Sequence, residues 1–221
     1  MEAARVPPGP GPGPGPREAD VAPAPDPTGG RAAGVWAPAD PGPLGLAGFA
    51  LTTFLLSMVN ANLVSKSSLG AVLAVAIAYG GIAQLLAGMW EFRTGNTFGA
   101  VAFSSYGAFW ISFYFLGHVT GSAVTPHGLA LYLFAWGGFT AYMFLASLRT
   151  TGAIALVFLL LAITFVLLGL GNIGGGHPNL LHAGGGVGIA TAAAAWYASF
   201  AAVMNSTFGR VILPVIPLRR V

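Results

Sequence analysis

Six long apolar runs, separated by short polar segments, constrain this chain more than any other feature. Each run approaches the roughly 20 residues that a helix needs to cross the hydrocarbon core of a bilayer. Only 7% of the 221 residues are charged, whereas soluble domains carry about 25%. The sequence therefore predicts an all-α polytopic membrane protein, a bundle of six transmembrane helices. The predicted helices cover about 44–64, 71–91, 98–118, 129–148, 153–171 and 186–205.

The ends of the chain differ in composition from the apolar part. Residues 1–35 are rich in Pro, Gly and Ala, include four successive Gly-Pro pairs at 9–16 and contain no apolar run that would form a signal peptide. This composition predicts a disordered tail. The transmembrane domain is expected over 36–210, followed by a short C-terminal tail over 211–221.

The basic residues predict the orientation in the membrane. Eight of the nine lie before the first run, in the second and fourth connections, or after the last run, and only Lys66 lies in the other connections. Because cytoplasmic loops carry an excess of Lys and Arg, both termini are expected in the cytoplasm. The predicted location is the plasma or inner membrane.

One acidic residue stands out in the apolar part of the chain. Glu91 is the only carboxylate after Asp40 and lies seven residues after Gln84, so the two side chains share a helical face. Two interpretations of Glu91 remain open. It carries a proton, or it pairs with Arg93 or with a helix end.

The remaining polar residues narrow the function. No Asp follows position 40, so no Ser-His-Asp set, paired catalytic carboxylates or phosphate-binding loop can be assembled, and an enzyme is not expected. His177 and His182 are five apart with no carboxylate nearby, a weak pattern for a metal. His182 is interpreted as a proton-handling group or as a solvated loop residue. No metal, cofactor or nucleic-acid partner is expected, and the chain has no cysteine.

Hydroxyl and amide side chains concentrate on the first three predicted helices. In the first of them Phe49, Thr53, Leu56 and Asn60 follow helical spacing and form a mixed apolar and polar face. Two interpretations are open: the hydroxyls satisfy carbonyls of their own or neighbouring helices, or they line a path through the membrane.

Several motifs, in a consistent order, resemble the acetate uptake transporter family of bacterial succinate–acetate permeases and fungal acetate- and ammonia-related proteins. The matching segments are 40–49, YGGIAQ at 79–84, AGMWE at 87–91, GNTFG at 95–99, SYGAFW at 105–110, GNI at 171–173 and FGR at 208–210. The resemblance covers about residues 40–217. The family signature N-P-A-P-L-G-L here reads Asp40, Pro41, Gly42, Pro43, Leu44, Gly45 and Leu46.

The resemblance implies six helices around a central pore in each subunit, and a homo-hexamer in the lipid bilayer. It also implies a hydrophobic constriction, which corresponds here to Phe49, Tyr106 and Leu161. Family members move acetate and in some cases succinate, generally coupled to protons. Asp40 replaces the Asn of the signature, which adds a carboxyl group where an anion would approach.

A small carboxylate has an apolar end that tolerates such a constriction and a charged end that needs donors. Thr52, Thr53, Gln84 and Ser105 are predicted to supply donors along the substrate path. Three functions remain open: a proton-linked transporter, a passive channel for the same anions, or a membrane sensor that binds acetate without moving it.

Overall fold

The computed structural model describes residue 36 and residues 38–120, 124–174 and 176–218. Within this part, six helical segments are long and apolar enough to cross a membrane, which confirms the predicted all-α bundle. The spans are Gly42–Asn60, Lys66–Thr94, Thr97–His118, Pro126–Ser147, Gly152–Gly171 and Pro178–Phe208.

The second span is a composite of three helical types. A 3-10 turn, η2 (Lys66–Ser68), leads into α2 (Leu69–Ile77), a π-helical turn η3 (Ala78–Ala83) and α3 (Gln84–Thr94). The third span is α4 (Thr97–Phe115) with a π-helical end, η4 (Leu116–Thr120). The other spans are single helices: α1 (Gly42–Asn60), α5 (Pro126–Ser147), α6 (Gly152–Gly171) and α7 (Pro178–Phe208).

Local sequence explains where these helices begin. Proline, whose fixed φ suits the first turn, occupies that turn in α1, α5 and α7. The side chains of Asn96, Thr125 and Thr151 accept hydrogen bonds from backbone N–H groups of the first turns of α4, α5 and α6. Gly95, with φ +79°, ends α3 in the left-handed conformation.

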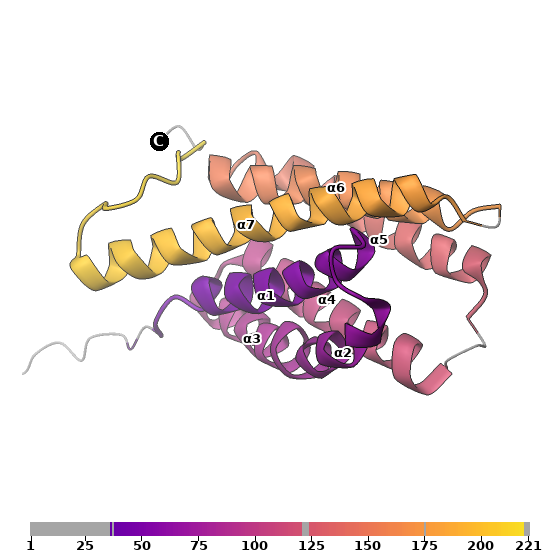
Figure 1. Ribbon diagram of the computed structural model, residues 1–221. Coiled ribbons are helices and arrows are strands. Elements are labelled where there is room, and N and C mark those ends of the chain that lie inside the picture. The colour runs from indigo at the N-terminus through magenta and orange to yellow at the C-terminus, as the bar shows by residue number, and fades with distance from the viewer. Residues whose placement is uncertain (1–35, 37, 121–123, 175, 219–221) are drawn as a thin grey trace, which may run out of the picture. The chain divides into compact units, whose positions relative to one another are not determined.

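The longest helix, α7, lies along both α1 and α6, as Figure 1 shows. On the other sides of the bundle, α5 packs on α6, and α3 packs on α4. We call the end of the bundle that contains η2 the Lys66 end, and the end that contains the α3–α4 turn the Arg93 end. Because successive spans are antiparallel, α7 begins at the Lys66 end and finishes at the Arg93 end.

The structure corrects the predicted start of the sixth span and the predicted end of the first span. The sixth span was predicted to begin at 186 after a flexible glycine-rich loop, but α7 begins at Pro178 and therefore contains His182. The glycines are helical because they allow close packing: a Cβ on Gly185 would collide with the backbone of Ala61. The first helix was predicted to reach residue 64 but ends at Asn60, and Asn62 adopts a φ of +58°.

The segment after α7 returns to the start of α6. Asn205 holds it by accepting from the backbone N of Ile212 and Leu213 (2.6 and 2.9 Å). Further along, the carbonyl of Ile216 accepts from Gly152 N at 2.7 Å. Residues 211–218 of the expected C-terminal tail are thus hydrogen-bonded to α6 and α7, and they satisfy amides of the first turn of α6 that lack helical partners.

The closest approach between α1 and the second span depends on glycine. A Cβ on Gly48 would lie 2.6 Å from the carbonyl oxygen of Tyr79, and one on Gly80 would lie 2.5 Å from Thr52 Oγ1. These distances are shorter than real Cβ contacts, so only glycine allows the two backbones to pack this closely.

We therefore expect Gly48→Ala to destabilise the bundle, because backbone atoms must move to admit the methyl group. Overpacking of this kind costs about 1–3 kcal/mol, which corresponds to a fall of roughly 2–10 °C in apparent melting temperature. Gly138→Ala in α5 is the matched control, because a Cβ there meets nothing within 4 Å. Thermal unfolding of the detergent-purified variants checks this; equal melting temperatures would contradict it.

Candidate functional site

A cavity of about 390 Å³ runs into the bundle from the Lys66 end. Its walls come from α1, η2, α2, α4, α5, α6 and α7, so it lies among nearly all the spans. The four residues of the face predicted on the first helix, Phe49, Thr53, Leu56 and Asn60, all line it. The helical spacing of these residues thus correctly predicted one shared face.

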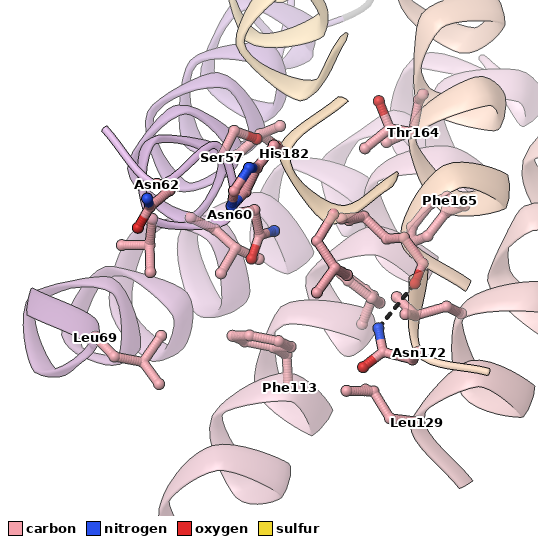
Figure 2. Close-up of a pocket in the computed structure, with 18 of the residues that line it drawn as sticks. Ser57, Asn60, Asn62, Leu69, Phe113, Leu129, Thr164, Phe165, Asn172 and His182 are labelled. Atoms are coloured by element: carbon pink, nitrogen blue, oxygen red, sulfur yellow. Dashed lines mark hydrogen bonds between the residues drawn. The ribbon is translucent and has the colours of Figure 1, made fainter. Parts of the chain in front are cut away.

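The rim of the cavity is polar. Figure 2 shows Asn60 and Asn62 at the end of α1 near His182 of α7, with Asn172 on the other side of the opening. Asn172 uses its Nδ2 to donate to the carbonyl of Leu168 at 2.8 Å. Apart from these groups the walls are mainly aromatic and aliphatic side chains from α4, α5 and α6.

Two buried donors on the cavity wall have no hydrogen-bond partner. Thr53 is 5% exposed and Trp110 is 2% exposed, and both line the cavity. Thr53 Oγ1 and Trp110 Nε1 make no hydrogen bond within the described part of the chain. Because an unpaired buried donor is costly, these two groups are exceptions that require a physical explanation.

Another buried hydroxyl on this wall, that of Thr164, is already satisfied. Thr164 Oγ1 donates to the carbonyl of Leu160 at 2.9 Å and lies 3.4 Å from Thr191 Oγ1. Thr164 thus follows the first of the two interpretations of the hydroxyls, in which the side chain hydrogen-bonds a carbonyl of its own helix. The contrast distinguishes Thr53 from Thr164.

Phe49 and Leu161 line the cavity near the middle of their helices, and each is only 4% exposed. Tyr106 does not line the cavity but packs on Phe49, with ring centroids 5.7 Å apart. Its hydroxyl lies 2.9 Å from Thr140 Oγ1. The three residues predicted as a constriction are therefore all buried in the interior, with Phe49 and Leu161 on the cavity wall and Tyr106 packed against Phe49.

The remaining residues predicted on the substrate path lie outside the cavity lining. Thr52 is buried and donates to the carbonyl of Gly48 at 2.9 Å. Gln84 is also buried, and its Oε1 has no partner among the described residues. Ser105 is half-buried in α4. Of the four predicted path residues, only Thr53 lines the cavity.

Glu91 is buried near the turn between α3 and α4, at the Arg93 end. Its Oε2 accepts from Thr94 Oγ1 at 3.0 Å, and its backbone carbonyl accepts from Asn96 N at 3.1 Å. A Cβ on Gly99 would lie 2.6 Å from Glu91 Oε1, so the carboxyl group packs on the first turn of α4. A helix N-terminus favours a negative charge, which matches the predicted helix-end role.

The signature segment forms the first turns of α1 at the Arg93 end. Asp40 Oδ1 accepts from Gly42 N at 2.9 Å and so caps the first turn. The carbonyl of Pro43 accepts from Ser199 Oγ of α7 at 2.7 Å. A second hollow of about 450 Å³ between α1 and α7 is lined by Asp40, Pro43 and Leu44. None of residues 40–46 lines the cavity at the Lys66 end.

Sequence reasoning missed two of the groups that shape the cavity. Trp110 was noted only as part of a motif, and its unpaired N–H could not be known without its surroundings. Asn172 was assigned to a loop without a role. The described residues contain no cluster of three or more His, Cys, Asp or Glu that could hold a metal ion.

The chain matches known proteins over most of its length. The model of the GPR1/FUN34/yaaH family matches residues 29–220. Acetate permease A of Emericella nidulans is 43% identical over 195 residues, which cover 80% of this chain and 65% of that protein. The succinate-acetate/proton symporter SatP of Escherichia coli is 41% identical over 181 residues, which cover 80% of this chain and 95% of that protein.

A solved structure shows the same architecture. The structure of the bacterial acetate channel SatP superposes with a TM-score of 0.76 at 40% sequence identity, covering 80% of this chain and 99% of that one. The six membrane-spanning helices and these relatives identify a multi-pass membrane protein. The chain belongs to the GPR1/FUN34/yaaH family.

Proposed function

We propose that this protein carries acetate and related small carboxylates, including succinate, across the plasma or inner membrane, coupled to protons. The observation that carries the proposal is the pair of unpaired buried donors, Thr53 and Trp110, on a cavity wall that is mainly aromatic and aliphatic inside the polar rim. The names of the relatives, an acetate permease and a succinate-acetate/proton symporter, support the same substrate class.

The cavity suits a small carboxylate better than a neutral or a cationic solute. A carboxylate accepts hydrogen bonds and donates none, and Thr53 and Trp110 offer donors that no described group of the protein satisfies. The apolar end of acetate or propionate would lie against the aromatic and aliphatic walls. No described carboxylate lines the cavity, so nothing there repels an anion.

Phe49, Tyr106 and Leu161 are proposed to form the constriction that separates the cavity from the Arg93 end. A charged group that crosses such an apolar ring loses its hydration without replacement, which is costly. A proton that travels with the carboxylate removes most of this cost. It also removes the opposition of an inside-negative potential to anion entry, about 2.3 kcal/mol per 100 mV.

Orientation and assembly complete the proposal. The bias of basic residues favours the Arg93 end and both termini in the cytoplasm, so the cavity at the Lys66 end would open to the outside. The family resemblance favours a homo-hexamer.

The second candidate is a passive channel for the same anions, which is favoured by the solved relative, because that protein is described as a bacterial acetate channel. Uptake of labelled acetate into proteoliposomes decides between the two. We expect accumulation above the acetate gradient when a proton gradient is applied inward, and its loss when a protonophore is added. Flux that only follows the acetate gradient would favour the channel. A folded protein that shows no acetate flux would contradict both the transporter and the channel and would favour a membrane sensor that binds acetate without moving it.

Thr53→Val tests the carboxylate site, because valine keeps the shape and removes the donor. A hydrogen bond to a charged group contributes about 1.5–3 kcal/mol, so we expect the half-saturation concentration for acetate to rise at least tenfold. Thr164→Val is the matched control, because that hydroxyl lies on the same wall but donates to its own helix. Equal effects of the two substitutions would argue against a site at Thr53.

The proton-linked residue is proposed to be His182 rather than Glu91. His182 lines the cavity, where Lys66 is the only other titratable residue among those described. Glu91 instead holds the α3–α4 turn through Thr94.

We therefore expect His182→Gln to flatten the pH dependence of acetate uptake, because glutamine cannot carry the proton. Glu91→Gln should preserve this dependence, because the amide oxygen still accepts from Thr94. His177→Gln is a control, since His177 precedes α7 and does not line the cavity. A flattened profile for Glu91→Gln alone would reverse the assignment.

A further inference from the structure

We infer that Lys66 makes the mouth of the cavity selective for anions, so that the carboxylate enters in its ionised form. This inference rests on the proposed function and names the species that the cavity receives. In the sequence, Lys66 is notable only as the single basic residue in the first, third and fifth connections between the predicted helices. The structure places it on the cavity lining, together with Asn60, Asn62 and His182.

The backbone of Lys66 has a defined conformation. It begins the 3-10 turn η2, where Ser65 caps the turn: its Oγ accepts from Ser67 N at 3.3 Å. Just before it, the backbone N of Leu63 and of Val64 donate to the carbonyl of Met58 at 3.0 and 3.2 Å. These bonds attach the connection to the end of α1 and so hold the backbone of Lys66 beside the opening.

No described carboxylate lies near enough to neutralise this charge. The described part of the chain contains two carboxylates, Asp40 before α1 and Glu91 near the end of α3. Both are at the Arg93 end, a full helix length from Lys66. The described arginines, Arg93, Arg149 and Arg210, are also at that end. The other polar residues of the rim are amides and one imidazole, so no described group of the rim is an acid that would oppose the Lys66 charge.

A single charge is effective here because of the shape around it. Cavities with apolar, low-dielectric walls concentrate the field of a charge at their mouth and raise the local concentration of ions of opposite sign. A neutral acid gains nothing from this field. A cationic mouth followed by two unpaired donors therefore forms a sequence of contacts for an anion, first to Lys66 and then to Thr53 and Trp110.

A thiol reporter tests the charge selectivity without any transport. The chain has no cysteine, so Asn60→Cys places a single thiol on the cavity wall. Its rates of modification by a sulfonate-bearing and a trimethylammonium-bearing methanethiosulfonate are compared in the same buffer, in chains that all keep His182. At about 10 mM ionic strength we expect Lys66→Gln to lower the anion-to-cation rate ratio roughly tenfold, and about 1 M salt to abolish the difference.

The controls separate a local effect from a change in net charge. Lys66→Arg should keep the ratio of the parent, and Lys66→Glu should lower it further. Arg149→Gln removes one positive charge at the opposite end and should leave the ratio unchanged. A ratio that changes less than twofold in Lys66→Gln, or equally in Arg149→Gln, would overturn the inference.

Acetate uptake then tests the substrate itself. In the chain without the reporter, Lys66→Gln should raise the half-saturation concentration about threefold at about 10 mM ionic strength and leave it unchanged at about 1 M salt. If the thiol rates show an anion-selective mouth but the half-saturation concentration does not change in this salt-dependent way, acetate does not enter as an anion. If the unmodified protein moves no acetate, the proposed function is wrong, and so is the claim that acetate enters here as an anion. The ratio of the two thiol modification rates still decides whether the cavity selects anions.

Discussion

The absence of water inside a membrane is the constraint on which the rest of this structure depends. Every buried polar group must find a partner within the protein. Thr52, Thr140, Thr164 and Thr191 do so by donating to the carbonyl four residues earlier in their own helices, at 2.7–2.9 Å. Against this background an unpaired buried donor is an exception, and the two on the cavity wall, Thr53 and Trp110, are the basis of the proposed carboxylate site.

Close packing between helices is the second constraint on this structure. Without a hydrophobic drive between helices in lipid, association depends on van der Waals contact and on small residues. Gly48 and Gly80 bring α1 against η3, and Gly185 brings α7 against the end of α1. The same helix α1 carries Phe49, Thr53 and Asn60 into the cavity. The packing that holds α1 in place therefore also positions the residues of the site.

The two ends of the bundle differ in their charged residues. The Lys66 end holds one described ammonium group and no described carboxylate, whereas the Arg93 end holds Asp40 and Glu91 together with three described arginines. Between them lie the apolar side chains of Phe49 and Leu161. Anion recruitment, binding by neutral donors and an apolar barrier thus follow one another along the proposed path, each with a different physical basis.

The sequence by itself determined the six spans, their helical class and the shared face of Phe49, Thr53, Leu56 and Asn60, because apolar length and helical periodicity are local properties. It misplaced the start of α7, since glycines that look flexible in a sequence become helical when a neighbouring backbone packs on them. Only the tertiary structure decided that Gln84, Thr52 and Ser105 lie off the cavity, and that Trp110 keeps an unpaired N–H. Whether a polar side chain is satisfied depends on contacts between segments far apart in the chain, and no local pattern encodes them.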